Sequence, residues 1–335
     1  MTSPLESLST RLLPWLEPAL RQFETAHARG QLGHAWLISG PAGVGKINLA
    51  LVLANRLLGA PAPPAKLDAV TALAALRERH KPMDRHPDLH WLHPEEDKET
   101  ISVEQVRDVI ESFALTAHRG RGKVVIVEYA EALTTAAANA LLKTLEEPSQ
   151  NSYLLLLSHQ PGRLPATIRS RCQQLKLVAP PVAVVAAWLD KAASAVAEAQ
   201  QAVGSAPLRI AAVMQASDLS VFNALQDDVT RICEDRTDPV AVAHSWAKNH
   251  PELALSWLGR CLHAEIRARS GADSTEVTVP PTATLHNAWR SVPTRTLFDQ
   301  YRRAEQLQNL LGSGLNVELA LQALLSVFVV NRGRT

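Results

Sequence analysis

The clearest candidate for chemistry is a glycine-rich turn, in which Gly40, Gly43 and Gly45 precede Lys46 and Ile47. The turn follows an apolar run of strand length and precedes a helical pattern, which is the context of a phosphate-binding loop. Glycines let backbone N–H groups point at phosphate oxygens, and a helix N-terminus and a lysine add positive charge. The next position needs the hydroxyl of Ser or Thr to ligate Mg²⁺, and Ile47 has none. The sequence therefore predicts the geometry of a P-loop and leaves nucleotide binding open.

A second candidate lies where the apolar run 124–127 ends, at Glu128 and Tyr129. An ATPase places Asp here to organise Mg²⁺, followed by Glu to activate water. Glu128 could hold a metal indirectly. Tyr129 cannot act as a base near neutral pH, because the free pKa of tyrosine is ~10. Since Ile47 and Tyr129 remove a metal ligand and a base, we expect that the chain does not hydrolyse ATP by itself.

The elements that must position these residues can be read from apolar patterning. Strands are predicted at residues 35–39, 89–92, 124–127, 153–157 and 175–178, and a helix at 46–58. Continuous apolar runs suit parallel strands covered on both faces. Ser102 with Gln105 is a capping box, and Thr134 or Thr135 can cap a helix that Pro148 ends. Alternating strands and helices indicate a doubly wound α/β domain, and beyond Pro180 the pattern is almost only helical.

Composition excludes several other classes of protein. The 335 residues include 34 basic and 33 acidic side chains, a net charge of +1. This excludes a small basic protein that coats nucleic acid. The three cysteines lie far apart, which excludes a disulfide scaffold and a four-thiolate zinc site. Early acidic residues and Pro14 make a poor signal peptide, and no apolar run reaches the ~20 residues that cross a bilayer. We expect a cytoplasmic protein with no membrane partner.

Three segments carry a resemblance to a known family. Residues 138–148 (ANALLKTLEEP), 153–158 (YLLLLS) and 164–172 (LPATIRSRC) are similar in order and spacing to the bacterial clamp-loader branch of the AAA+ proteins. The altered P-loop chemistry resembles the delta-prime family of DNA polymerase III within that branch. Residues 314–325 are similar to the end of that family's collar.

The resemblance implies a fold with three domains. These are an AAA+ P-loop α/β domain with a parallel sheet at 1–178, a small helical lid at 179–219 and an all-helical collar for oligomerisation at 220–335. In this family the triplet that matches Ser170, Arg171 and Cys172 supplies an arginine finger in trans to the ATP site of a neighbouring subunit. The other reading of Arg171 is a local ion pair at the start of a strand.

Two further positions resemble sensors of nucleotide phosphate. Arg209 matches the second sensor and Ser158 the end of the first-sensor strand. The simpler readings are an exposed helical arginine and a turn residue that ends a strand. With Gly40, Gly43, Gly45, Lys46 and Glu128, these residues would form a nucleotide site that is either used or vestigial.

The resemblance implies a stator subunit of a clamp loader, one that helps to load a sliding clamp onto primed DNA in replication. The implied partners are clamp-loader subunits of the gamma/tau and delta types, the sliding clamp and, through the assembled complex, primed DNA. The polymerase activity of the DNA polymerase III holoenzyme, a nucleotidyl transfer, would lie in another subunit. No cofactor is required, and weak ATP binding is compatible with this role.

The alternatives are an active P-loop ATPase of DNA replication or repair and a small-molecule kinase. ATP turnover by the purified chain separates the stator from the ATPase.

The sequence departs from this family in one respect. Members commonly carry a four-cysteine zinc module after the P-loop helix, but residues 59–90 contain no cysteine. His80, His86 and His90 lack thiolates or a carboxylate cage beside them and do not define a zinc site. We therefore expect no zinc. The basic turn 119–123 could touch phosphate, although a solvated loop before a strand is its default reading.

Overall fold

The computed structural model describes residues 8–59, 64–78, 87–95, 98–114, 122–216, 219–271, 282–311 and 316–329. The chain forms two compact units, which are considered separately. The first comprises Met1–Lys191 with Ala206–Ala211, and the second comprises Ala192–Ser205 with Ala212–Thr335. The finer division into three domains at 178 and 219 stays a prediction.

The first unit is built on a five-stranded sheet in which every pairing is parallel. In spatial order the strands are β4 (Leu89–Leu92), β5 (Lys123–Val127), β6 (Ser152–Ser158), β2 (Ala35–Ser39) and β7 (Gln173–Lys176). Strand β2 lies between β6 and β7 and runs parallel to β6, so the carboxyl ends of β2 and β6 lie side by side. The loops that carry chemistry therefore gather along one edge of the sheet.

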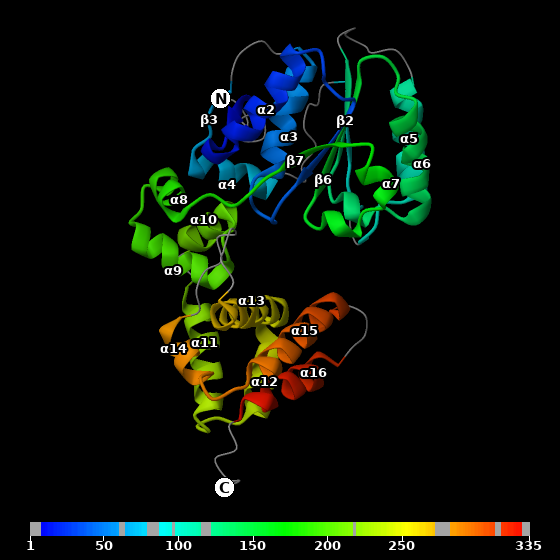
Figure 1. The fold of residues 1–335 in the computed structure, drawn as a ribbon. Helices are drawn as coiled ribbons and strands as arrows, with labels where there is room; N and C mark the ends of the chain where they lie inside the picture. The colour runs from blue at the N-terminus through cyan, green and yellow to red at the C-terminus, as the bar shows by residue number, and fades with distance from the viewer. Residues whose placement is uncertain are drawn as a thin grey trace. The chain divides into compact units, whose positions relative to one another are not determined.

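Helices cover both faces of this sheet (Figure 1). Trp36 and Ile38 of β2 pack in one apolar cluster with α3 (Lys46–Leu57) and α2 (Glu17–Ala28). Ala35 and Leu37 point the other way, into a cluster that includes side chains of α5 (Val103–Ala114), α6 (Thr135–Glu146) and α7 (Ala166–Arg169). Side chains of a strand alternate between the two faces of a sheet. Because both faces are covered here, all five residues of β2 are buried.

The helix ends follow the chemistry expected from the sequence. The Ser102 backbone N–H donates to Gln105 Oε1 at 2.9 Å, and the Gln105 N–H donates to Ser102 Oγ at 3.3 Å, so the predicted capping box is confirmed. Thr134 caps α6, since its hydroxyl accepts from the Ala137 N–H at 3.2 Å. The predicted fold class, an α/β domain with a parallel sheet followed by helices, is confirmed.

Two features of the first unit differ from expectation. The strand predicted at 175–178 runs instead from Gln173 to Lys176, because it is an edge strand with exposed polar side chains, which an apolar run cannot reveal. A small parallel pair was also missed. It joins β1 (Arg11–Leu12) to β3 (Ala65–Lys66), two-residue strands too short to show a pattern. Helices α4 (Ala69–Glu78) and α8 (Val182–Leu189) complete the unit.

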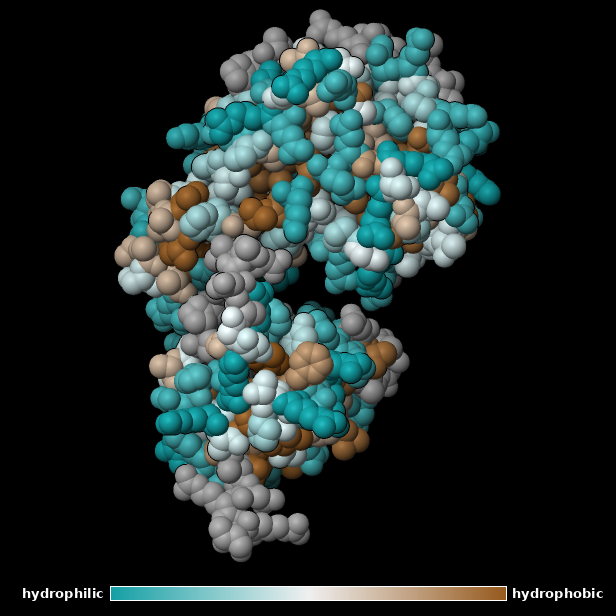
Figure 2. Space-filling model, viewed as in Figure 1, coloured by the Kyte–Doolittle hydropathy of each residue, from teal (hydrophilic) through white to brown (hydrophobic). Residues whose placement is uncertain are grey.

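The described secondary structure of the second unit is helical, as predicted. Its helices are α9 (Ala193–Val203), α11 (Ser220–Cys233), α12 (Pro239–Asn249), α13 (Pro251–Ser270), α14 (Ala283–Ala288), α15 (Thr294–Leu310) and α16 (Val317–Leu325), while α10 (Pro207–Ala216) spans the boundary. Helix α13 packs along α15, and α12 packs along α16. On the face seen in Figure 2, the surface of both units is mainly hydrophilic. No helix in the described part of the chain is long and apolar enough to span a membrane.

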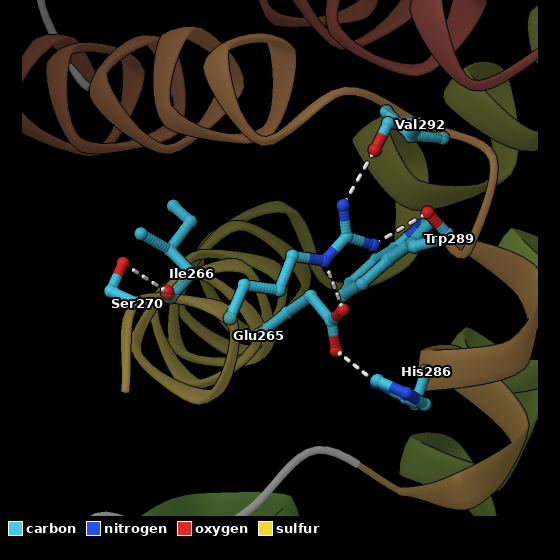
Figure 3. Close-up of polar contacts among 7 residues, drawn as sticks. Glu265, Ile266, Ser270, His286, Trp289 and Val292 are labelled. Atoms are coloured by element: carbon cyan, nitrogen blue, oxygen red, sulfur yellow. Dashed lines mark hydrogen bonds and ion pairs between the residues drawn. The ribbon is translucent and has the colours of Figure 1, made fainter. Parts of the chain in front are cut away.

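A buried carboxylate organises one end of this helical unit (Figure 3). Glu265 on α13 is fully buried, and its two oxygens accept hydrogen bonds from Arg269 Nε at 2.6 Å and His286 Nδ1 at 2.9 Å. Arg269 also donates to the carbonyls of Trp289 at 2.7 Å and Val292 at 2.6 Å. One acid and one guanidinium thereby tie α13 to α14 and to the turn that precedes α15.

We expect Glu265→Gln to lower the local unfolding free energy of α13 and α14 by about 1.5–3 kcal/mol, because a charge-assisted hydrogen bond is lost and Arg269 keeps its charge. Hydrogen exchange of the backbone amides in both helices measures this change. Ser270→Ala is the control. Its exposed hydroxyl donates to the Ile266 carbonyl within α13 at 2.8 Å, so the expected loss is below about 1 kcal/mol. Unchanged protection in Glu265→Gln would contradict the role given to this carboxylate.

Candidate functional site

The glycine-rich turn lies at the carboxyl end of β2 and leads directly into α3. Gly45 is the N-cap of α3 with φ +101°, and a Cβ there would lie 2.5 Å from a methyl of Leu13. Gly43 has φ +85°, and a Cβ there would lie 3.2 Å from side-chain atoms of Ala206 and Arg209. Both positions therefore need glycine for conformation and for space. The Gly40 N–H donates to the Ser158 carbonyl at 3.3 Å, which joins the loop to β6.

The Lys46 ammonium is turned onto its own loop. Its Nζ donates to the carbonyls of Gly40 at 2.6 Å and Pro41 at 2.9 Å, and the residue is only 5% exposed. Burial lowers the pKa of Lys46 to about 8, although the nearby carboxylates of Glu131 and Glu128 act in the opposite direction. The two carbonyl oxygens offset part of the cost of burying the ammonium.

The residues after Lys46 serve packing and anchoring. Ile47 is partly buried against the apolar cluster of α3 and presents no oxygen at the metal-ligand position. Asn48 is 3% exposed, and its amide accepts from the Leu13 N–H at 2.9 Å and donates to the carbonyls of Leu8 and Arg11, each at 2.8 Å. Asn48 thus fastens the N-terminal segment to α3. Its one sequence signal was a polar residue inside an apolar helix.

The acidic end of β5 is also held by internal contacts. Glu128 is 8% exposed and accepts from the Trp91 indole N–H at 3.2 Å. Tyr129 has φ +58°, a left-handed conformation that is costly for a bulky residue, and its ring meets that of His159 edge-on at 5.2 Å. Glu131 Oε1 accepts from the His159 N–H at 2.9 Å. These contacts couple the end of β5 to the end of β6.

The two residues that resemble phosphate sensors lie beside the loop. Ser158 is fully buried, and its hydroxyl accepts from the Gln160 N–H at 3.1 Å. Arg209 is exposed on α10 and close enough to Lys46 to lower its pKa. The Leu208 N–H donates to the Gly43 carbonyl at 3.1 Å, so α10 begins directly on the loop. The structure therefore brings the predicted loop, Glu128, Ser158 and Arg209 together.

Arg171 lies outside this group, just after α7. Its Nη2 pairs with Glu146 Oε1 at 2.7 Å, its Nη1 donates to the Thr167 carbonyl at 3.0 Å, and the side chain is 38% exposed. Ser170 is exposed, and its hydroxyl donates to the Thr167 carbonyl at 3.1 Å. Cys172 is buried, which raises the pKa of its thiol to about 12, so it packs as a small residue.

Comparison with known proteins adds to this geometry. Residues 15–181 match the family model described as DNA polymerase III, delta subunit, and residues 220–329 match the model for the C-terminal part of that delta subunit. DNA polymerase III subunit delta' of Escherichia coli (strain K12) is 34% identical over 330 residues, which cover 94% of each chain. The chain belongs to the DNA polymerase III delta-prime family.

A second delta' subunit agrees with this assignment, and another subunit of DNA polymerase III is similar over a shorter span. Subunit delta' of Pseudomonas aeruginosa is 36% identical over 255 residues, which cover 73% of this chain and 74% of that protein. DNA polymerase III subunit tau of Escherichia coli (strain K12) is 35% identical over 153 residues, which cover 45% of this chain and 22% of the tau subunit.

A cavity of about 720 Å³ in this delta-prime family member was not foreseen. It lies beyond the carboxyl ends of β4 and β5, and its lining includes Trp91, Lys98, Glu128, Tyr129 and Arg163. None of residues 40–46 is among the described residues that line it. The cavity is therefore on the β4 side of Glu128, and the loop of Lys46 is on the other side.

Metal ligands do not gather anywhere in the described ranges of the chain. No group of three or more His, Cys, Asp or Glu side chains there could hold a metal ion. His90 lies in β4, while His80 and His86 are outside the described residues. The expectation of no zinc stays a prediction. Of the basic turn 119–123, residues 119–121 are likewise outside, and Lys123 is the buried first residue of β5.

The lowered pKa of Lys46 predicts how stability depends on pH. Below about pH 8 Lys46 is protonated in both the folded and the unfolded chain, and folding bears the full cost of burying the charge. Between about pH 8 and 10.5 the folded chain releases this proton while the unfolded chain keeps it. The unfolded state then binds more protons, so the free energy of unfolding rises with pH, by up to about 3 kcal/mol.

The measurement compares the unfolding free energy of wild type with that of Lys46→Met from pH 7 to 10.5, because methionine removes this titration while groups elsewhere cancel in the difference. Wild type should gain stability relative to Lys46→Met as the pH rises. A difference that does not change with pH would contradict the burial of a charged ammonium in the folded chain.

Proposed function

We propose that this chain is a subunit of a DNA polymerase III clamp loader that does not hydrolyse ATP and lends Arg171 to the ATP site of a neighbouring subunit. Its partners would be subunits of the gamma/tau and delta types, the sliding clamp and, through the complex, primed DNA. The observation that carries the proposal is an exposed arginine in the Ser-Arg-Cys triplet of a chain whose own site lacks both the metal ligand and the base.

The loss of hydrolysis in cis is supported by two residues, one at the loop and one at the end of β5. Ile47 offers no oxygen to Mg²⁺, and Tyr129 stands where a carboxylate would activate water. Phosphoryl transfer needs the metal and the oriented water at the same time. Nucleotide that binds here would therefore not be hydrolysed by this chain.

The role in trans is supported by the position and chemistry of Arg171. A guanidinium is a rigid, permanently charged fork of donors, which suits the charge that develops on a transferred phosphoryl group. The local ion pair, the simpler reading of this residue, exists in the structure with Glu146. Its two side chains are 38% and 52% exposed, so it contributes only about 0–1 kcal/mol to stability. A pair this weak leaves Arg171 available to a neighbouring subunit.

The test is reconstitution of the clamp loader with Arg171→Ala. The mutant chain should fold and assemble, because an exposed side chain is removed, yet the complex should lose clamp loading and DNA-stimulated ATP turnover. A trans arginine contributes ~10³–10⁵ in rate at its site, and other ATP sites would make the loss in total turnover smaller. Arg171→Lys should rescue poorly, since an ammonium lacks the two-pronged geometry.

Glu146→Gln separates the two readings of Arg171. If the arginine serves only its ion pair, this variant reproduces the loss seen with Arg171→Ala. If the arginine acts in trans, Glu146→Gln retains clamp loading. Both complexes must be compared at equal assembly, measured by mass. Normal clamp loading by Arg171→Ala would remove the proposed role in trans.

The isolated chain provides an independent test. We expect no Mg²⁺-dependent ATP turnover above background, and no change with Lys46→Ala, because the hydroxyl at position 47 and the base at position 129 are missing. Release of inorganic phosphate from ATP measures this directly. Robust turnover that Lys46→Ala abolishes would instead support the active ATPase, which was the alternative left by the sequence.

A further inference from the structure

Both outer nitrogens of the Arg171 guanidinium are already in use within the chain. Nη2 pairs with Glu146 Oε1 at 2.7 Å, and Nη1 donates to the carbonyl of Thr167 at 3.0 Å. Glu146 is the last residue of α6, and Thr167 lies in α7, four residues before Arg171. The guanidinium therefore bridges two helices that follow different strands of the sheet.

We propose that Glu146 is a holding residue for Arg171, one that keeps the guanidinium bound within the chain until a phosphate on a neighbouring subunit displaces it. This inference rests on the proposed function of Arg171. Carboxylate and phosphate are both anions that accept charge-assisted hydrogen bonds from the same N–H groups. The N–H that meets Glu146 is not available to a phosphate oxygen, and the carboxylate repels a phosphate at the same guanidinium, so the two anions compete.

The Thr167 carbonyl and the Glu146 carboxylate act on the guanidinium in different ways. The Thr167 carbonyl is uncharged and belongs to the backbone of the helix that precedes Arg171, so it orients the guanidinium without neutralising it. Glu146 supplies the charge that must be exchanged. Since both side chains of the pair are partly exposed, water and salt weaken their attraction, and a phosphate with more negative charge can replace the carboxylate. Docking would then release the guanidinium only where a phosphate is present.

The neighbouring acid offers a matched control. Glu147 is exposed, follows Glu146 directly and caps α6 through its backbone N–H, which donates to the Lys143 carbonyl at 2.9 Å. Within the described part of the chain its carboxylate is not paired with Arg171, whose ion pair is with Glu146. Glu147→Gln therefore changes the charge of this surface as Glu146→Gln does, but leaves the contact with the guanidinium intact.

The experiment measures ATP turnover by reconstituted, DNA-stimulated complexes over a range of ATP concentrations. The part of the turnover that depends on Arg171 is obtained by subtracting the Arg171→Ala complex. For this part, Glu146→Gln should raise kcat/KM about two- to fivefold, which corresponds to about 0.4–1 kcal/mol at about 1.4 kcal/mol per tenfold change. The gain should shrink as salt is added, because salt screens the pair. Glu147→Gln should show no gain.

A double variant completes the cycle. In the Arg171→Ala background, Glu146→Gln should have no effect, because the competing partner is absent. A lower kcat/KM for Glu146→Gln would overturn the proposal and make Glu146 a residue that positions the engaged guanidinium. Equal kcat/KM values for Glu146→Gln and Glu147→Gln would also overturn it. So would a gain from Glu146→Gln that is just as large in the Arg171→Ala background. If Arg171→Ala itself leaves turnover unchanged, the proposed function fails first, so the two failures are distinguishable.

Discussion

A buried ammonium must have oxygen partners, and the glycine-rich loop of the first unit meets this requirement at Lys46. Its Nζ donates to the carbonyls of Gly40 and Pro41, so the segment from Pro41 to Lys46 turns back on itself at the start of α3. That turn requires glycine at 43 and 45, where φ is positive. The start of α10 contacts the loop through the hydrogen bond from the Leu208 N–H to the Gly43 carbonyl.

Ile47 and Tyr129 stand where a metal ligand and a base were expected, and both make packing contacts instead. A hydroxyl at position 47 is useful only beside a metal ion, and in its place Ile47 adds apolar surface to the core around α3. Tyr129 offers no base, but its ring contacts the ring of His159. The backbone N–H of His159 donates in turn to Glu131. Ile47 therefore contributes to the core, and Tyr129 contributes to the contacts between the ends of β5 and β6. Such fixed contacts are compatible with the proposed absence of hydrolysis in cis.

Local signals in the sequence predicted the parts of the structure that depend on neighbours along the chain. Helix α3 after the glycine turn and the caps at Ser102 and Thr134 are set by residues within four positions, and they were found as expected. The edge strand β7 was misplaced because its pattern is polar, and the bonds of Asn48 to Leu8 and Arg11 span more than 35 residues. The partners of Glu265 and the cavity beyond β4 likewise depend on how helices and strands pack, which a linear pattern does not encode.

At Arg171, one feature could be predicted from the sequence and another depends on how the helices pack. Its triplet could be recognised from the sequence, but its partner Glu146 lies 25 residues earlier and meets it only because α6 and α7 pack on the same face of the sheet. That face is opposite to the one covered by α3. The sheet therefore separates the loop of Lys46 from Arg171, whose side chain is partly exposed. Under the proposed function, changes in the nucleotide chemistry of the loop would leave the surface that carries Arg171 undisturbed, because the two are supported by different apolar clusters.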